Sequence, residues 1–212
     1  MSVGMSVGMS GSGTGAEEAG GDRRLLRGAR SRRAILRRAV DVASLDGLDG
    51  LSFGALAADL GISKSGVQTL FGTKEKLQLA TVECAGGVFE EAVVRPARGA
   101  EHGVARLRAL VEAWLVYASE PLLPGGCFWA ANQAAFDSRP GPVRDALFAG
   151  QRRWRALLAD ELRHAGAADP ELAAFQLDAV LLAANTGLRC GEDGVVERVR
   201  KVAGNVAGNV AE

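Results

Sequence analysis

The stretch SFGALAADLGISKSGVQTLFGTKEKL, residues 52–77, has the pattern of two short helices followed by the start of a third. Ser52 can cap the first helix, because its hydroxyl accepts a free backbone N–H at the helix start. Gly61 supplies the left-handed residue that ends many helices, and Ser63 can cap a second helix that continues to about residue 71. Two helices joined by a turn of about three or four residues make a helix-turn-helix.

The second helix, residues 64–71, has an unusual surface for a buried helix. We expect Val67, Leu70 and Phe71 to pack inward, with Ile62 filling the turn before them. The other side chains are short or polar, and a helix in the DNA major groove needs such donors, acceptors and small residues. An ordinary solvated helix would carry the same residues, since helix-turn-helix geometry also occurs without DNA.

Composition limits the classes of protein that fit. The 212 residues can bury a sizeable core in one or two domains. No run of 18 apolar residues and no basic-then-apolar leader is present, so we expect a cytoplasmic protein without a transmembrane span. The spacing of the three cysteines predicts neither a disulfide framework nor a metal site. We expect no cofactor and no enzyme, because no phosphate-binding glycine motif or catalytic histidine motif is found.

The charge is unevenly distributed, although the formal net charge is zero. Residues 21–80 hold eleven Lys/Arg and six Asp/Glu, whereas residues 81–212 hold fourteen and seventeen. A basic head on an acidic body indicates that only the head meets phosphates. Arginines cluster ahead of and along a helix expected at about 31–45. Such a run is often just a solvated face, but beside a helix-turn-helix it favours phosphate or minor-groove contacts, here by Arg30 and Arg33.

The head of the chain resembles the TetR family of bacterial repressors. The resemblance covers residues 30–80 and rests on residue types in a fixed order. These are Ile35, Ala39, Gly47, Ser52, Leu56, Ala57, Leu60, Gly61, Ile62, Ser63, Phe71, Thr73, Lys74 and Glu75. The resemblance implies that the helix after Ser63 is the recognition helix and that Thr73 and Lys74 contact the phosphate backbone. Free N–H groups at a helix N-terminus favour an anion, which agrees with that role.

The residues expected to contact DNA extend from the arginine-rich segment to the start of the third helix. Gln68 stands in a stretch where the family usually has aromatic residues and a histidine, and its amide can bind adenine through two hydrogen bonds. The complete set is Arg30, Arg33, Ser52, Ser63, Lys64, Ser65, Gln68, Thr69, Thr73 and Lys74.

Periodic apolar residues predict that the body is helical as well, which gives an all-α fold of about nine helices. We expect body helices at about 74–95, 101–119, 127–136, 143–164, 170–188 and 192–203, and Gly86-Gly87 allows a bend in the first. The predicted domains are a disordered tail at 1–21, a helix-turn-helix DNA-binding domain at 22–72 with its motif at 52–71, a ligand-binding and dimerisation domain at 73–205, and a frayed tail at 206–212.

Several aromatic residues gather in the middle of the chain, on the helices that surround the ligand cavity in TetR-like proteins. A cavity walled by apolar groups with a few polar ones suits a small apolar or amphipathic ligand, although the same spacing suits an ordinary core. The candidates are Phe89, Trp114, Tyr117, Cys127, Phe128, Trp129, Asn132, Gln133 and Phe136. Cys127 could instead be a redox thiol, but lone cysteines are more often buried fillers.

These features predict a ligand-responsive, DNA-binding transcriptional regulator of the repressor type. The resemblance implies a homodimer through helices near 143–164 and 170–188, and a dimer reads a palindromic operator. Ligand binding would shift the helix at 74–95 and change the distance between the two heads. The alternatives are a helical dimeric sensor or structural protein without specific DNA binding, and a redox sensor that uses Cys127.

Overall fold

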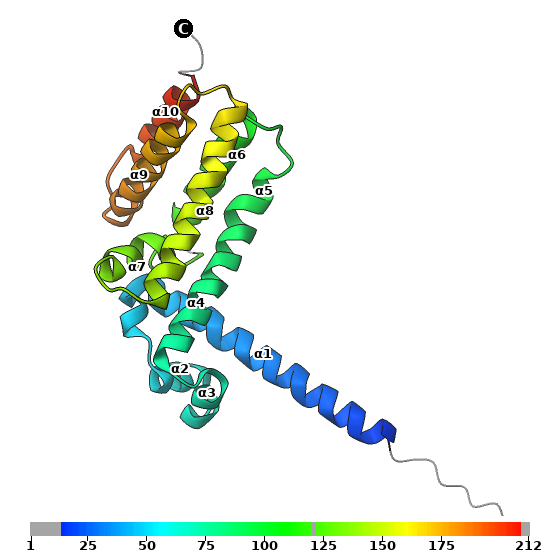
Figure 1. Cartoon of the computed structure of the whole chain (residues 1–212). Helices are drawn as coiled ribbons and strands as arrows, with labels where there is room; N and C mark the ends of the chain where they lie inside the picture. The colour runs from blue at the N-terminus through cyan, green and yellow to red at the C-terminus, as the bar shows by residue number, and fades with distance from the viewer. Residues whose placement is uncertain (1–13, 120–121, 209–212) are drawn as a thin grey trace, which may run out of the picture. The chain divides into compact units, whose positions relative to one another are not determined.

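The computed structural model of the chain describes residues 14–119 and 122–208, and all regular structure in these two ranges is helical (Figure 1). The all-α prediction is therefore confirmed. The chain divides into two units, Met1–Ala34 and Ile35–Glu212. Within the described ranges, no helix is long and apolar enough to span a membrane.

The first unit contains the beginning of helix α1 (Thr14–Asp46). Of the tail predicted at residues 1–21, residues 14–21 belong to α1, and residues 1–13 lie outside the described part of the chain. The sequence TGAEEAGGDRR contains alanine and glutamate, which are good helix formers, and it runs directly into the arginine-rich stretch. The two glycines in it lower the helix propensity without ending the helix.

The helix-turn-helix forms as predicted in the second unit. Helix α2 (Phe53–Leu60) begins at Ser52, whose hydroxyl accepts a hydrogen bond from the Ala55 N–H at 3.1 Å. It ends at Gly61 with φ +63°. Helix α3 (Lys64–Phe71) begins at Ser63. A short 3₁₀ helix, η1 (Leu48–Gly50), connects α1 to α2, and residues of α1 from position 35 onward complete the three-helix head.

Two apolar residues of the motif lie differently from the prediction. Leu70 is 39% exposed and Ile62 is 41% exposed, so neither fills the core. Val67 and Phe71, one helical turn apart, already occupy the inward face of α3. At 100° per residue, Leu70 is rotated to the side of that face, and a two-turn helix has a single narrow buried stripe.

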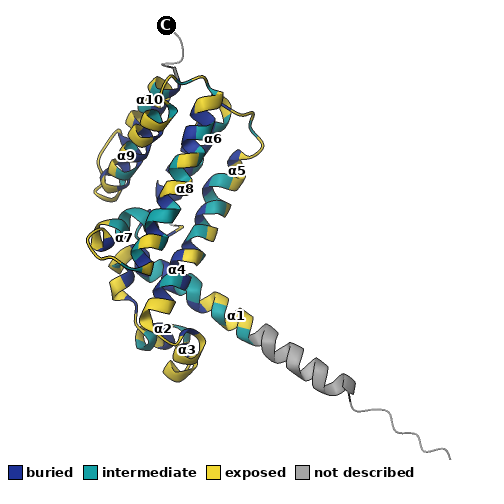
Figure 2. Cartoon of the chain, viewed as in Figure 1, coloured by how far each residue is buried: buried dark blue, intermediate teal, exposed yellow. Residues whose placement is uncertain are grey.

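The body consists of seven further α-helices and one π-helical turn. Their bounds are α4 (Lys74–Phe89), η2 (Glu90–Val94), α5 (Arg95–Ala97), α6 (Val104–Ser119), α7 (Phe128–Phe136), α8 (Pro142–His164), α9 (Pro170–Arg189) and α10 (Val195–Gly208). Helix α8 packs against α4, α6, α7 and α9, and α10 packs against α6 and α9. Figure 1 shows α2 and α3 beside the first turns of α4, and Figure 2 shows the exposed residues that cover their outer side.

Two details of the body differ from the sequence pattern. The helix from Lys74 does not break at Gly86-Gly87; it changes to the π-helical turn η2 a few residues later. At the other end, α10 continues through Gly208, so residues 206–208 of the tail predicted at 206–212 are helical. Ala203 and Ala207 are buried one turn apart on α10, and this packing explains why the alanine-glycine repeat stays helical. Residues 209–212 lie outside the described part of the chain.

Candidate DNA-binding surface and ligand cavity

Helix α3 presents a polar outer face over an apolar inner one. Val67 is fully buried and Phe71 is 5% exposed, and together they fix the helix on the head. Lys64, Ser65 and Gln68 are exposed on the other side, with Thr69 beside them. Thr69 donates its hydroxyl proton to the Ser65 carbonyl at 2.8 Å. The predicted recognition residues therefore share one accessible surface, which can offer donors and acceptors to base edges.

The starts of α3 and α4 belong to the same exposed region. The Ser63 hydroxyl accepts from the Gly66 N–H at 3.1 Å, and the Thr73 hydroxyl accepts from the Lys76 N–H at 3.2 Å. Both side chains therefore act as helix caps. The Lys74 ammonium donates to the Asp49 carbonyl at 2.6 Å, which ties the start of α4 to η1. An ammonium has three donor protons, so this contact leaves two for a phosphate.

The arginines near the head have different partners. Arg30 and Arg33 are exposed on α1 in the first unit. Arg38, in the second unit, pairs with Asp59 of α2 at 2.7 Å, and Arg37 donates to the Leu122 carbonyl at 2.8 Å. Part of the arginine run therefore holds the head together, and the composition of the run did not distinguish these members from the others.

A cavity of about 160 Å³ lies inside the body, where α4, η2, α6, α7, α8 and α9 meet. The three tryptophans of the chain, Trp114, Trp129 and Trp154, all line it. Phe89 also lines it and meets Trp154 edge to face, with ring centroids 5.1 Å apart. Such walls suit an apolar or aromatic ligand.

Polar groups enter the cavity from four elements, and the one from η2 is Glu90. Gln133 comes from α7, Gln151 and Arg153 come from α8, and Asp178 comes from α9. Gln151 donates to Asp178 at 3.1 Å, and Arg155 forms an ion pair with the same carboxylate at 2.8 Å. Burial raises the pKa of Asp178 above its ordinary value, although the charge of Arg155 opposes this shift.

Five of the nine predicted ligand residues lie on the cavity wall: Phe89, Trp114, Cys127, Trp129 and Gln133. The other four are outside the wall and are packed in the core with at most 7% of each residue exposed: Tyr117, Phe128, Asn132 and Phe136. The Phe128 N–H donates to the Tyr117 hydroxyl at 3.2 Å, so this tyrosine supports the start of α7. Burial raises the pKa of Tyr117 well above its ordinary value.

Cys127 lines the cavity but is 2% exposed. Burial raises the pKa of its thiol, so the thiol stays protonated at neutral pH. The thiolate is the reactive species, and for this reason the geometry gives no support to the redox alternative. The thiol that is exposed to solvent is Cys190, which follows α9.

The sequence reasoning missed the cavity residues that come from α8 and α9. Trp154, Gln151 and Asp178 lie on helices that were assigned to the dimer interface because of their length and apolarity. The available signal was a polar residue on an otherwise apolar helical face. Gln151 lies at helical spacing between Leu147 and Leu158 on the buried side of α8.

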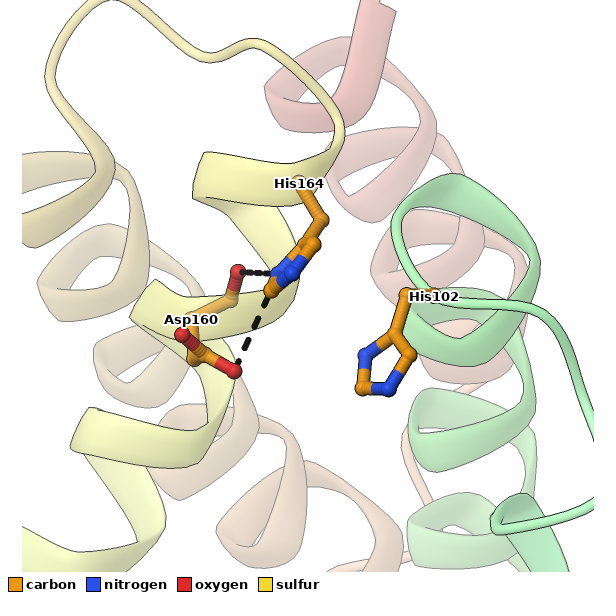
Figure 3. Close-up of side chains that lie close together, drawn as sticks. All are labelled: His102, Asp160 and His164. Atoms are coloured by element: carbon orange, nitrogen blue, oxygen red, sulfur yellow. Dashed lines mark hydrogen bonds and ion pairs between the residues drawn. The ribbon is translucent and has the colours of Figure 1, made fainter.

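A cluster of ionisable side chains lies at the far corner of the body (Figure 3). His102 precedes α6 and stacks on His164 of α8, with ring centroids 4.7 Å apart, while Asp160 lies one turn before His164. Glu161 is 1% exposed and lies 3.0 Å from His102 Nδ1. Arg106 donates to His102 Nε2 at 2.8 Å and forms an ion pair with the Glu161 carboxylate at 3.6 Å. These contacts fasten the α5–α6 corner to α8.

Comparison with known proteins agrees with this architecture. Residues 103–203 match the family described as the tetracyclin repressor-like C-terminal domain. No curated protein sequence matches the chain. Similar solved structures include a TetR-family regulator from Streptomyces coelicolor, with 20% identity, a TM-score of 0.76, and coverage of 88% of this chain and 97% of that one.

Two further structures show the same likeness. A TetR regulator from Chloroflexus aurantiacus has 22% identity and a TM-score of 0.75, and the match covers 86% of this chain and 94% of that one. AibR, solved with isovaleryl coenzyme A and operator DNA, has 22% identity and a TM-score of 0.64, with coverage of 84% and 97%. These likenesses establish the fold. Residues 103–203 therefore carry a tetracyclin repressor-like C-terminal domain, which follows a helix-turn-helix head.

Proposed function

We propose that the protein is a transcriptional repressor that binds a palindromic operator as a homodimer and is released when a small molecule enters the body. The observation that carries this proposal is the polar outer face of α3, which the fold leaves exposed while it buries Val67 and Phe71 beneath it. Such a regulator acts on DNA without catalysing a reaction, and we expect it to work in the cytoplasm.

The DNA-binding role rests on two kinds of residue in the head, one that can contact base edges and one that can contact phosphates. Gln68 is free of helix capping and can read a base edge in the major groove. Lys64 stands at the start of α3, and Lys74 at the start of α4; both are exposed and can contact phosphates. We propose that Arg30 and Arg33 add phosphate or minor-groove contacts from α1. The operator bound in the AibR structure is an example for a protein of the same fold.

The dimer is supported by the outer face of α9. Leu172 is 52% exposed and Phe175 is 55% exposed, and both are large apolar residues. They begin an exposed row that continues with small or polar residues at helical spacing: Gln176, Ala179, Ala183 and Thr186. Small residues let a second helix approach closely, and an apolar stripe on a surface helix calls for a partner. We propose that α8 and α9 of two copies form this interface.

The ligand-binding role rests on the aromatic-walled cavity between the head and the far corner of the body. Its aromatic walls and few polar groups are typical of small-molecule sites. Helix α4 begins at the head and contributes Gly86 and Phe89 to the cavity. A ligand that favours one position of α4 would change the distance between the two heads and lower the affinity for DNA.

The experiment that tests the function is a mobility shift with the DNA immediately upstream of the gene, at two salt concentrations. Specific binding that weakens steeply with salt is expected, because phosphate contacts release counterions. Lys74→Ala should weaken binding to every sequence alike, whereas Lys201→Ala, on the exposed side of α10, should have little effect. A protein that binds no sequence preferentially at either salt concentration would be a helical sensor or structural protein without a DNA site.

A further inference from the structure

We propose that helix α7 is a second element, beside α4, that reports the occupied cavity to the head, with Gln133 binding a hydrogen-bond acceptor on the ligand and Asn132 holding the end of α1. The proposal rests on the proposed regulatory function and adds to it the chemical class of the ligand and the path of its effect. It follows from two adjacent residues of α7 whose amides point to different places.

The first amide holds the head. Asn132 is fully buried, and its Oδ1 accepts from the Leu48 N–H at 2.7 Å. Its Nδ2 donates to the carbonyl of Ala43 at 3.0 Å and to that of Phe128 at 2.8 Å. Ala43 belongs to α1 and Leu48 to η1, so one side chain of α7 spans the junction that leads into the helix-turn-helix. Its hydrogen bonds fix both the position and the orientation of this amide.

The loop before α7 is held against the same junction. The Gly125 N–H donates to the Ser44 hydroxyl at 2.9 Å, and Arg37 bonds to the Leu122 carbonyl. A Cβ atom on Gly125 would lie 1.7 Å from the Ser44 carbonyl oxygen, so the two backbones are in direct contact. A movement of α7 must therefore move the end of α1.

The second amide faces the cavity. Gln133 lies on the cavity wall, and its Nε2 is shielded from solvent. Among the described residues, none forms a hydrogen bond with this donor. Trp129, one turn earlier on α7, also lines the cavity and packs on Gly150 of α8, where a Cβ would come within 2.6 Å of the indole ring. A buried donor without a partner favours a ligand that brings an acceptor.

The dimensions of the cavity indicate the class of ligand. A volume of about 160 Å³ is close to the roughly 150 Å³ of an engineered apolar cavity that binds benzene. The walls are aromatic, and the free polar group on α7 is a neutral donor. The carboxylate of Asp178 is occupied by Gln151 and Arg155, that of Glu90 pairs with Arg98, and Arg153 is exposed to solvent. These features fit a neutral molecule of one aromatic ring that carries a carbonyl or similar acceptor oxygen.

Acetophenone and α-methylstyrene form a matched pair of probes, because they have the same shape and only acetophenone has an acceptor oxygen. All three tryptophans line the cavity, so their fluorescence reports binding directly. Acetophenone should bind the wild-type protein about tenfold more tightly, as expected for one hydrogen bond to a buried donor. N-acetyltryptophanamide in solution corrects for collisional quenching.

Gln133→Met keeps the length of the side chain and removes the donor. In this variant the two probes should bind with equal affinity, while the affinity for α-methylstyrene stays at the wild-type value. Equal affinities in the wild-type protein, or a preference for acetophenone that survives in Gln133→Met, would overturn the assignment of Gln133.

Transmission along α7 is measured by amide hydrogen exchange in the unmodified protein. Saturation with acetophenone should change the exchange rate of the Leu48 amide, which is bonded to Asn132, at least about threefold more than that of the buried Val199 amide on α10. A change of equal size at both amides would reflect general stabilisation and would overturn the proposed path. Neither measurement uses DNA, so a protein that binds acetophenone but no operator would refute the proposed function and leave this inference standing.

Discussion

Helices α3 and α7 have eight and nine residues, and they use their polar side chains in opposite ways. In α3, Lys64 and Gln68 are exposed to solvent and make no contribution to the packing of the head. In α7, Asn132 is fully buried and bonds to backbone groups of α1, η1 and its own helix. One helix keeps its hydrogen-bonding groups for an external partner, and the other uses them inside the molecule.

This difference separates binding from stability. Removing an exposed polar side chain leaves the folded state almost unchanged, because water replaces the lost contacts in both states. Removing a buried one leaves its partners without hydrogen bonds, and that desolvation cost appears in the free energy of unfolding. Variants of the exposed polar residues of α3 should therefore alter DNA binding alone, and variants of the buried polar residues of α7 should alter stability.

The largest effect is expected for Gly125→Ala, in the loop that precedes α7. Its Cβ would lie 1.7 Å from the Ser44 carbonyl oxygen, and both groups belong to the backbone, so the loop must move away from α1. We expect a loss of about 3 kcal/mol or more in the free energy of unfolding, measured by urea denaturation. The control is Gly87→Ala on α4, where nothing lies within 4 Å and helix propensity predicts a gain of about 1 kcal/mol. Equal effects of the two substitutions would contradict the close contact.

Asn132→Ala should have the next largest effect, a loss of about 2–4 kcal/mol in the free energy of unfolding. The substitution leaves the buried Leu48 N–H and Ala43 carbonyl unpaired. The same chemical change at Asn205, which is exposed on α10, should cost less than about 0.5 kcal/mol. The comparison between α3 and α7 fails if these two variants unfold at the same urea concentration.

Gln68→Ala tests the other side of the comparison. Its thermal midpoint should match that of the wild-type protein, since the side chain is exposed. Binding to a set of operator variants should lose preference at one base position, by about 1–3 kcal/mol. An unchanged preference at every position would remove Gln68 as a base reader, and a lowered midpoint would show that it supports the head.

The smallest effect is a pH dependence that comes from Asp178. Burial raises the pKa of this carboxyl in the folded protein, so the folded state binds its proton more tightly than the unfolded state does. The contribution of Asp178 to stability is therefore complete below its ordinary pKa and is lost as the pH rises through the raised value. The stability of the wild-type protein relative to Asp178→Asn should fall over this pH range. A difference that is independent of pH would contradict the shift.

The head was predictable because its signals are local. Ser52, Gly61 and Ser63 each determine a helix boundary through contacts with residues at most four positions away. Which residues of α3 face the core was harder to predict. Val67, Leu70 and Phe71 are all apolar, and the pattern did not show that Leu70 would be exposed. Predictions of helix boundaries from capping and turn residues were correct here. Predictions of which residues lie on the buried face of a short helix were only partly correct.

The cavity was only partly predictable because six elements form it. Trp129 and Gln133 were identified from an aromatic cluster, but Trp154 and Asp178 come from helices that meet the cluster only in the folded body. The role of Asn132 could not be predicted either, because its hydrogen-bond partners in η1 and α1 are 84 and 89 positions away in the sequence. No periodic pattern in a single sequence records contacts of that range.

The π-helical turn η2 makes the number of residues in this part of the chain as important as their identity. The Arg95 N–H bonds to the Glu90 carbonyl five positions earlier, so this turn contains one residue more than a regular helix would hold. Deleting a residue between 90 and 94 would let the helix wind evenly, but it would rotate all that follows by about 100°. Ala97, which is 1% exposed, would then leave its place. Related sequences should therefore vary here by substitution, while changes of length are excluded.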